Sequence, residues 1–123
     1  MTALNSDLFL IRQISHTDHG IRVQLGVNAD AELLKGHFPG HPVVPGASML
    51  QLVIDILEGA LDTPLMLRKA DHLKFLSLIE PGIEAVELEI NYQIKEEGEL
   101  FVTAKLSAET TVYFKLQGKF IIS

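Results

Sequence analysis

The residues best suited to acid–base chemistry lie in one short stretch, where a histidine in a proline-stiffened loop precedes an apolar segment. His37 begins the run His-Phe-Pro-Gly-His-Pro-Val-Val-Pro-Gly, which ends at Gly46. An imidazole titrates near neutral pH and can accept or donate a proton there. The segment after Gly46 is expected to be a helix, whose first N–H groups lack intrahelical partners and can polarise a carbonyl. The sequence therefore predicts acid–base chemistry beside a carbonyl group.

The helix that would position these groups is expected from about Gly46 to Leu61. Its apolar residues cover most of the circumference, which predicts a helix buried nearly all round. The exceptions form one narrow polar stripe, because they are three, four and three residues apart: Ser48, Gln51, Asp55 and Glu58.

Strand patterns dominate the rest of the chain. Apolar and polar residues alternate with a period of two, which gives each strand one buried and one wet face. Strands are expected over about 8–14, 21–28, 66–79, 86–94, 100–106 and 112–122. The Glu97-Gly98 pair is the expected turn between the fourth and fifth of these, and Glu80-Pro81-Gly82 ends the third. One helix among five or six antiparallel strands suggests a sheet wrapped around a central helix.

Composition narrows the class of protein. At 123 residues, of which 47% are hydrophobic, the chain is expected to form one domain over residues 1–123. A net charge of −6 argues against nucleic acid as a partner, and the absence of cysteine excludes disulfides and thiolate metal sites. No apolar run is long enough to span a membrane, and residues 1–7 lack a signal-peptide pattern. The cytoplasm is the expected location.

The run from His37 to Gly46 closely resembles the active-site signature of the beta-hydroxyacyl-(acyl carrier protein) dehydratases, which have the hotdog fold. Residues 70–75 (Ala-Asp-His-Leu-Lys-Phe) and Glu80-Pro81-Gly82 resemble the family's strand after the helix and its Pro-Gly turn. The resemblance covers most of the chain from about residue 5. It implies an α+β hotdog fold, an antiparallel sheet of five to six strands around one long central helix, in a homodimer or a higher oligomer.

The resemblance also implies roles for individual residues. His37 would move the proton on the carbon beside a thioester carbonyl, and the backbone N–H of Gly46 would bind that carbonyl. Phe38, Pro45 and Ala47 would line the substrate site beside them. An acid on the helix of the other subunit would protonate the leaving hydroxyl, so that a 3-hydroxyacyl thioester on an acyl carrier protein becomes a 2-enoyl thioester. The acyl group would enter a tunnel along the helix, and no cofactor is expected because elimination changes no redox state.

The helix departs from the family pattern at two positions. Gln51 occupies the position of the family's acid, fourteen residues after His37, and Asp55 occupies a position where the family has glutamine. Four residues advance about 6 Å along a helix, so the carboxylate is displaced by about one turn. A glutamine amide can hold a hydroxyl but cannot supply a proton. Asp55 could supply it directly, through water or not at all, or it could be a buried acid paired at the dimer interface.

Other polar residues are open to more than one interpretation. His37 and His41 are four residues apart, but Pro39 and Gly40 between them exclude a helix there, so no metal site is expected. His41 either rims the pocket or is a second titrating group.

Four basic residues, Lys35, Arg68, Lys69 and Lys74, could form a positive rim for an acidic carrier or could be ordinary solubilising side chains.

Three functions are consistent with the sequence. The first is dehydration of a 3-hydroxyacyl thioester in fatty-acid or related polyene synthesis, with His37 as base, Asp55 as acid and Gln51 as a positioning group. The second is an acyl-thioester hydrolase of the same fold. The third is a catalytically impaired, carrier-binding subunit of a mixed dimer. A product assay separates the first two.

Overall fold

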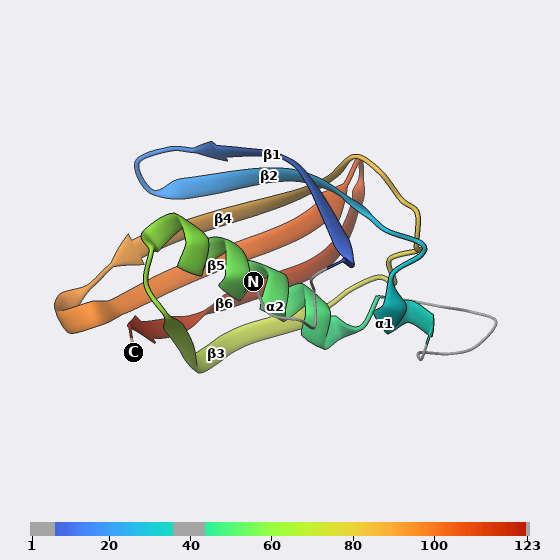
Figure 1. Ribbon diagram of the computed structural model, residues 1–123. Coiled ribbons are helices and arrows are strands. Elements are labelled where there is room, and N and C mark those ends of the chain that lie inside the picture. Colours follow the sequence, from blue (N-terminus) through green and yellow to red (C-terminus); the bar gives the residue numbers. More distant parts are fainter. Residues whose placement is uncertain (1–6, 36–43, 123) are drawn as a thin grey trace.

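Six antiparallel strands form one sheet, and a helix of sixteen residues lies across one of its faces (Figure 1). The structure is a computed structural model and describes residues 7–35 and 44–122. The elements are, in chain order, β1 (Phe9–His16), β2 (Gly20–Val27), α1 (Glu32–Lys35), α2 (Gly46–Leu61), β3 (Leu65–Phe75), β4 (Val86–Ile94), η2 (Glu96–Gly98), β5 (Glu99–Ala108) and β6 (Thr111–Ile122). This is the hotdog fold that the family resemblance implied.

The order of strands in the sheet is β1-β2-β4-β5-β6-β3. The strand that follows the helix in sequence therefore lies at one edge of the sheet, and the first strand lies at the other (Figure 1). The predicted alternation places the apolar face of each central strand toward α2. Leu88, for example, pairs with Val23 and with Leu106, and all three side chains are fully buried.

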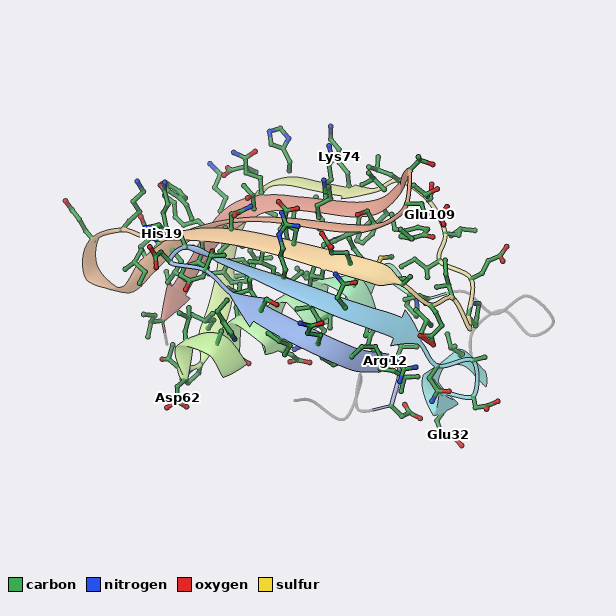
Figure 2. The ribbon with its side chains drawn as sticks, turned by 90° about the horizontal axis from the view of Figure 1, so that it is seen from above. Arg12, His19, Glu32, Asp62, Lys74 and Glu109 are labelled. Carbon is green, nitrogen blue, oxygen red and sulfur yellow. The ribbon has the colours of Figure 1, made fainter. Side chains whose placement is uncertain are left out.

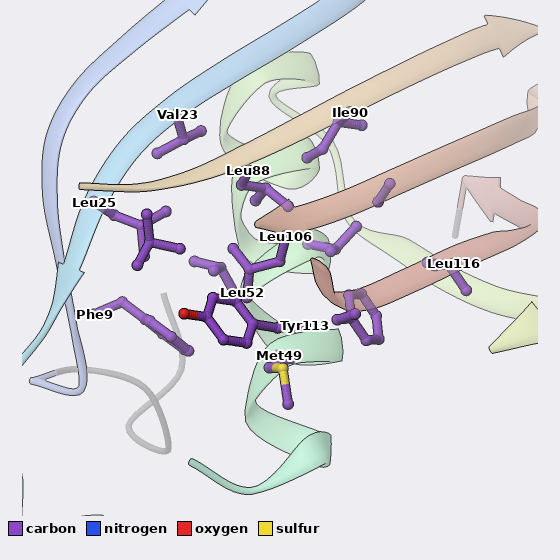
Figure 3. Packing of buried hydrophobic residues seen from close by; sticks show 14 of the residues in the cluster. Phe9, Val23, Leu25, Met49, Leu52, Leu88, Ile90, Leu106, Tyr113 and Leu116 are labelled. Carbon is purple, nitrogen blue, oxygen red and sulfur yellow. The ribbon is translucent and has the colours of Figure 1, made fainter. Parts of the chain in front are cut away.

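The core lies between this face of the sheet and one side of α2. Met49 and Leu52 of the helix pack there among strand residues that include Leu25, Leu106 and Tyr113 (Figure 3). Burial of such side chains contributes about 1.5–3 kcal/mol each, so this interface supplies most of the energy that holds the helix on the sheet.

The helix is not buried nearly all round, and that prediction is wrong for the isolated chain. Its fully buried residues are Ser48, Met49, Leu52, Val53 and Leu57. The remaining apolar residues, such as Ile54 and Ile56, are only partly covered. A single curved sheet covers one side of a helix, so the described residues leave the other side of α2 only partly covered.

Strand β3 ends at Phe75, four residues earlier than expected. The N–H groups of Leu76 and Ser77 both donate to the carbonyl of Tyr113, which turns the chain out of the regular ladder. The segment then returns to the core at Ile79, which is fully buried and whose carbonyl accepts from Val44. Apolar character alone predicted strand here, but it reflects burial at a single position.

Two short elements were not expected from the sequence, namely the single turn α1 and the 3₁₀ turn η2. The expected Pro81-Gly82 turn is present, and Gly82 adopts a φ of 87°, which favours glycine. Its N–H donates to Val27 at 2.9 Å and joins this turn to the end of β2.

Candidate active site

The start of α2 presents backbone donors that the side chain of its N-cap residue does not cap. Pro45 is the N-cap residue, with an extended backbone (φ −65°, ψ 144°), and it has no side chain that can accept a hydrogen bond from the first turn. Its backbone carbonyl instead accepts a hydrogen bond from the N–H of Ser48 at 3.0 Å. Pro45 and Gly46 are half-buried and Ala47 is exposed. A carbonyl or an anion that reaches this turn therefore meets positively polarised N–H groups.

Gly46 also has a steric reason to be glycine. A Cβ at this position would lie 2.8 Å from the ring of Phe75 at the end of β3. That ring in turn packs against Phe114, with the ring centroids 5.4 Å apart. The absence of a side chain at Gly46 thus allows an aromatic residue to seat directly against the helix start.

One turn further along the helix, the two exchanged residues contact each other. The side-chain amide of Gln51 donates to Oδ1 of Asp55 at 2.9 Å. The second oxygen, Oδ2, is buried and has no hydrogen-bond partner among the described residues. A buried carboxyl oxygen without a partner is uncommon, because its desolvation is then uncompensated. Asp55 is consequently held through Oδ1, whereas its buried Oδ2 has no partner in the described part of the chain.

Asp55 lies at a pocket between α2 and β1. The pocket has a volume of about 330 Å³ and is lined by Phe9, Ile11, Ile14, His16, Leu52, Asp55, Ile56, Gly59 and Ala60. Its walls are apolar except for the carboxyl of Asp55 and the exposed His16. This composition suits a hydrocarbon chain with one hydrogen-bonding group near the carboxyl.

The other two residues of the polar stripe have different environments. The carboxylate of Glu58 accepts a hydrogen bond from the N–H of Leu65 at 2.8 Å, which ties the end of the helix to the start of β3. Ser48 is 1% exposed and lies in the first helical turn. Glu58 thus has a structural contact, and Gln51 and Asp55 are the remaining candidates for chemistry on the stripe.

Several predicted site residues lie outside the described part of the chain. These are His37, Phe38 and His41, so the distance from His37 to Asp55 and the role of His41 stay predictions. Of the remaining histidines, His16, His19 and His72 are all exposed. Among the described residues no three His, Asp or Glu side chains converge on a possible metal position, and none of the described helices is long and apolar enough to cross a membrane.

The four basic residues predicted as a carrier-docking rim do not all share one environment. Lys69 is within 3.6 Å of Asp71, whereas Lys74 points away from the helix on the other face of the sheet (Figure 2). Arg68 is exposed, and the side chain of Lys35 is outside the described part.

Sequence reasoning missed Tyr113, which packs beside Met49 and Leu52 under the helix (Figure 3). Burial raises its pKa above the usual value of 10.0, and the carboxylates of Glu80 and Glu109 add to the shift. The phenol therefore stays protonated through neutral pH. Strand alternation alone would not have identified it, because Phe114, Leu116 and Phe120 occupy the buried positions of β6. Tyr113 is also buried because the β5–β6 register shifts between Leu106 and Ser107.

Comparison with known families gives one match that covers most of the chain. The family model described as ApeI dehydratase, of the ApeI-like group, matches residues 13–116. No curated protein matches the sequence.

Solved structures with the same fold include a dehydratase heterocomplex, ApeI:P from Xenorhabdus doucetiae. It is 19% identical, has a TM-score of 0.79, and the match covers 91% of this chain and 96% of that one. An uncharacterized protein from Erwinia carotovora subsp. atroseptica is 21% identical, with a TM-score of 0.66 and coverage of 94% and 96%. A conserved protein from Pseudomonas aeruginosa is 18% identical, with a TM-score of 0.68 and coverage of 100% and 95%.

Proposed function

Since the chain belongs to the ApeI-like dehydratase family, we propose that it eliminates water from a 3-hydroxyacyl thioester to give a trans-2-enoyl thioester. The substrate is carried by an acyl carrier protein, and the reaction serves fatty-acid or related polyene synthesis in the cytoplasm. The observation that carries this proposal is the carboxyl of Asp55 beside an apolar pocket. Gln51 holds one of its oxygens at 2.9 Å, and the other is buried without a hydrogen-bond partner among the described residues.

In the proposed reaction His37 removes a proton from C2 of the acyl chain. Negative charge then grows on the thioester oxygen, where the N–H of Gly46 at the uncapped helix start stabilises it. Asp55 donates a proton to the 3-hydroxyl, the C3–O bond breaks and water leaves. His37 then releases its proton to solvent, and Asp55 takes one up, which restores both groups.

In the proposed reaction, the hydrogen bond from Gln51 determines which oxygen of Asp55 carries the acidic proton. An amide N–H can only donate, so Oδ1 is the acceptor in this contact and the acidic proton belongs on Oδ2. Oδ2 is the oxygen with no other partner in the described part of the chain. In this view Gln51 is a positioning residue, and the exchange of acid and amide keeps a carboxyl on the same helix face one turn away.

The pocket beside Asp55 offers room for part of the acyl chain. Its walls come from β1 and from the second half of α2, so a chain bound there would run along the helix. A pocket of about 330 Å³ is at the small end of the usual range for ligand sites, which favours short or medium acyl groups.

The direct test is a product assay with a 3-hydroxyacyl thioester. Wild-type protein should form the enoyl thioester, detected by its absorbance and by mass spectrometry, without release of free thiol. Asp55→Asn should lower kcat by about 100-fold or more, since loss of general acid–base catalysis typically costs 10²–10⁴. Glu58→Gln is the matched control on the same helix stripe, and it should retain activity because Glu58 only holds the Leu65 N–H.

Two results would contradict the proposal. Release of free acid and thiol would identify a hydrolase instead. Full activity in Asp55→Asn would remove Asp55 from the mechanism.

A second candidate function is that of a subunit in a mixed complex. The glutamine at the family's acid position favours it, and the ApeI:P structure is itself described as a dehydratase heterocomplex. In that case the isolated chain would be inactive, and Gln51→Glu would raise activity strongly by restoring the acid. An unchanged, high activity of the isolated wild-type chain would exclude this candidate.

We further infer that the chain forms at least a homodimer through the β3 edge. β3 is an edge strand of eleven residues, and it carries exposed apolar side chains, among them Met66 and Phe75. A long apolar edge strand is a template for pairing with another chain. A second copy here would also lie beside the part of α2 that its own sheet leaves uncovered.

A further inference from the structure

Three lysines form a row on the face of the sheet that is turned away from α2. Lys74 of β3 pairs with Lys115 of β6, and Lys115 pairs with Lys105 of β5. All three side chains are exposed, and Figure 2 shows Lys74 pointing away from the helix. Like charges directly opposite each other on neighbouring strands destabilise a sheet. The row is therefore a feature that the fold itself does not favour.

No acid in the described part of the chain forms an ion pair with these three lysines. The neighbouring lysines differ in this respect, because Lys69 pairs with Asp71 and Lys119 pairs with Glu99. Glu89 continues the row on β4, but its carboxylate is within 3.7 Å of Arg22 on the next strand. The positive row occurs in a chain whose net charge is −6, so it does not follow from the overall composition.

The lysine row lines a hollow on the sheet. The hollow has a volume of about 400 Å³, and its lining consists of His72, Lys74, Glu89, Asn91, Thr103, Ala104, Lys105, Lys115, Leu116 and Gln117. A second row lies on the same face of the sheet, two residues along each strand, and it offers hydrogen-bond donors and acceptors. It consists of His72, Gln117, Thr103 and Asn91. Positive charge and polar groups are thus combined on one concave surface.

We propose that this hollow is a docking surface for an acidic helix of a partner protein. Neighbouring strands are about 4.8 Å apart, so the row of three ammonium groups spans about 10 Å. Acids at positions i, i+3 and i+7 of a helix share one face and span about 10.5 Å, at 1.5 Å per residue. An extended peptide fits the row less well, because three alternate side chains on it span about 13 Å. A single phosphate is too small to contact all three ammonium groups.

This proposal does not depend on the proposed dehydratase activity. The hollow and α2 lie on opposite faces of the sheet, so a helix docked on the lysine row leaves the start of α2 and the Asp55 pocket free. The surface therefore suits a partner that recruits or tethers the protein.

The test uses two synthetic helical peptides, one with glutamates at i, i+3 and i+7 and one with glutamines at the same positions. The glutamate peptide should bind the wild-type protein, with the largest NMR amide shifts in β5 and β6. The triple variant Lys74→Gln/Lys105→Gln/Lys115→Gln should bind about 3- to 100-fold more weakly, because each exposed ion pair contributes about 1.5- to 5-fold. Binding should also weaken as salt is raised from 0.05 to 0.3 M, since exposed charges are screened.

The matched control is Arg12→Gln/Arg68→Gln/Lys95→Gln, which removes the same charge outside the hollow and should retain most of the affinity. Thermal unfolding confirms that both triple variants are folded. Equal weakening in the two variants would show attraction by net charge alone and overturn the proposal. Equal binding of the glutamine peptide, or displacement of the glutamate peptide by equimolar inorganic phosphate, would overturn it as well.

Discussion

Asp55 and Gln51 act as a pair at the scale of single residues. Their i, i+4 spacing places them on one face of α2, and the 2.9 Å contact fixes the orientation of the carboxyl. In the proposed reaction, this contact leaves Oδ2 as the oxygen that would protonate the substrate hydroxyl. If Asp55 is the acid, loss of Gln51 should therefore affect the chemical step more than binding.

We expect Gln51→Leu to lower kcat by about tenfold with little change in KM. Leucine keeps the volume of the side chain but removes the donor that orients Asp55, and a misplaced acid loses part of the 10²–10⁴ that such catalysis contributes. Steady-state kinetics measures both parameters. An unchanged kcat would show that the contact is structural only.

The raised pKa of Tyr113 predicts that the free energy of unfolding depends on pH in the alkaline range. Its pKa in the folded protein is raised above 10.0, first by burial and then by Glu80 and Glu109. Above about pH 10 the unfolded chain ionises at this tyrosine while the folded protein does not, so the free energy of unfolding falls as the pH rises. Below that pH both states are protonated and Tyr113 adds no dependence.

Tyr113→Phe should remove this component, because it keeps the ring and deletes the titrating hydroxyl. Urea unfolding of both proteins between pH 8 and 11 measures it. The difference in unfolding free energy between wild type and variant should be constant up to about pH 10 and then change. A constant difference up to pH 11 would contradict the prediction.

At the scale of elements, the pairing of β3 with β6 depends on a glycine. A Cβ on Gly118 would lie 2.6 Å from the backbone oxygen of Lys69, at a point where the β3–β6 register shifts on both sides. A backbone oxygen between paired strands cannot move away without breaking neighbouring hydrogen bonds of the sheet. Gly118→Ala should therefore lower the unfolding free energy by about 1–3 kcal/mol, the usual cost of overpacking.

Gly59 is the matched control for this prediction, because a Cβ there meets nothing within 4 Å. It lies inside α2, where alanine is favoured over glycine by about 0.8–1.0 kcal/mol. Gly59→Ala should thus stabilise the protein under the same urea titration. Similar effects of the two substitutions would refute the steric argument.

The lysine row, meaning Lys74, Lys115 and Lys105, should cost the sheet stability. Lys115→Glu would place a carboxylate between two ammonium groups on the adjacent strands, and each such cross-strand pair contributes about 0.2–1 kcal/mol. We expect a higher melting temperature for Lys115→Glu and a smaller gain for Lys115→Gln, which only relieves repulsion. A loss of stability in both variants would show that the row does not strain the sheet.

At the scale of the whole molecule, the proposed homodimer would cover the partly exposed helix and the apolar β3 edge. Met66 on β3 is 54% exposed and Leu78 beyond its end is 72% exposed. Met66→Glu/Leu78→Glu should convert a dimer into a monomer, because two carboxylates per chain would have to be desolvated at the interface.

Light scattering after size exclusion measures the mass of each species. Ile94→Glu is the control, since Ile94 is 66% exposed at the end of β4, away from the β3 edge. A monomeric wild-type protein at micromolar concentration would rule out the homodimer. A double variant that stays dimeric would place the interface elsewhere.

Local sequence patterns predicted most of the strands, the helix from Gly46 to Leu61 and the dehydratase family. Periodicity specifies these elements because side chains alternate along a strand and repeat every 3.6 residues along a helix. The spacing of His37, Gly46 and Gln51 pointed to the family and showed glutamine at the family's acid position, since these positions are read directly along the chain.

The contacts between distant residues became clear only from the fold. Strand register brings Lys74, Lys115 and Lys105 into one row, and no local pattern encodes that register. The closing of β1 over α2 creates the pocket at Asp55, and the turn of the chain at Leu76 ends β3 early. Contacts across the sheet depend on the packing of the whole chain, so spacing along the sequence could not predict them.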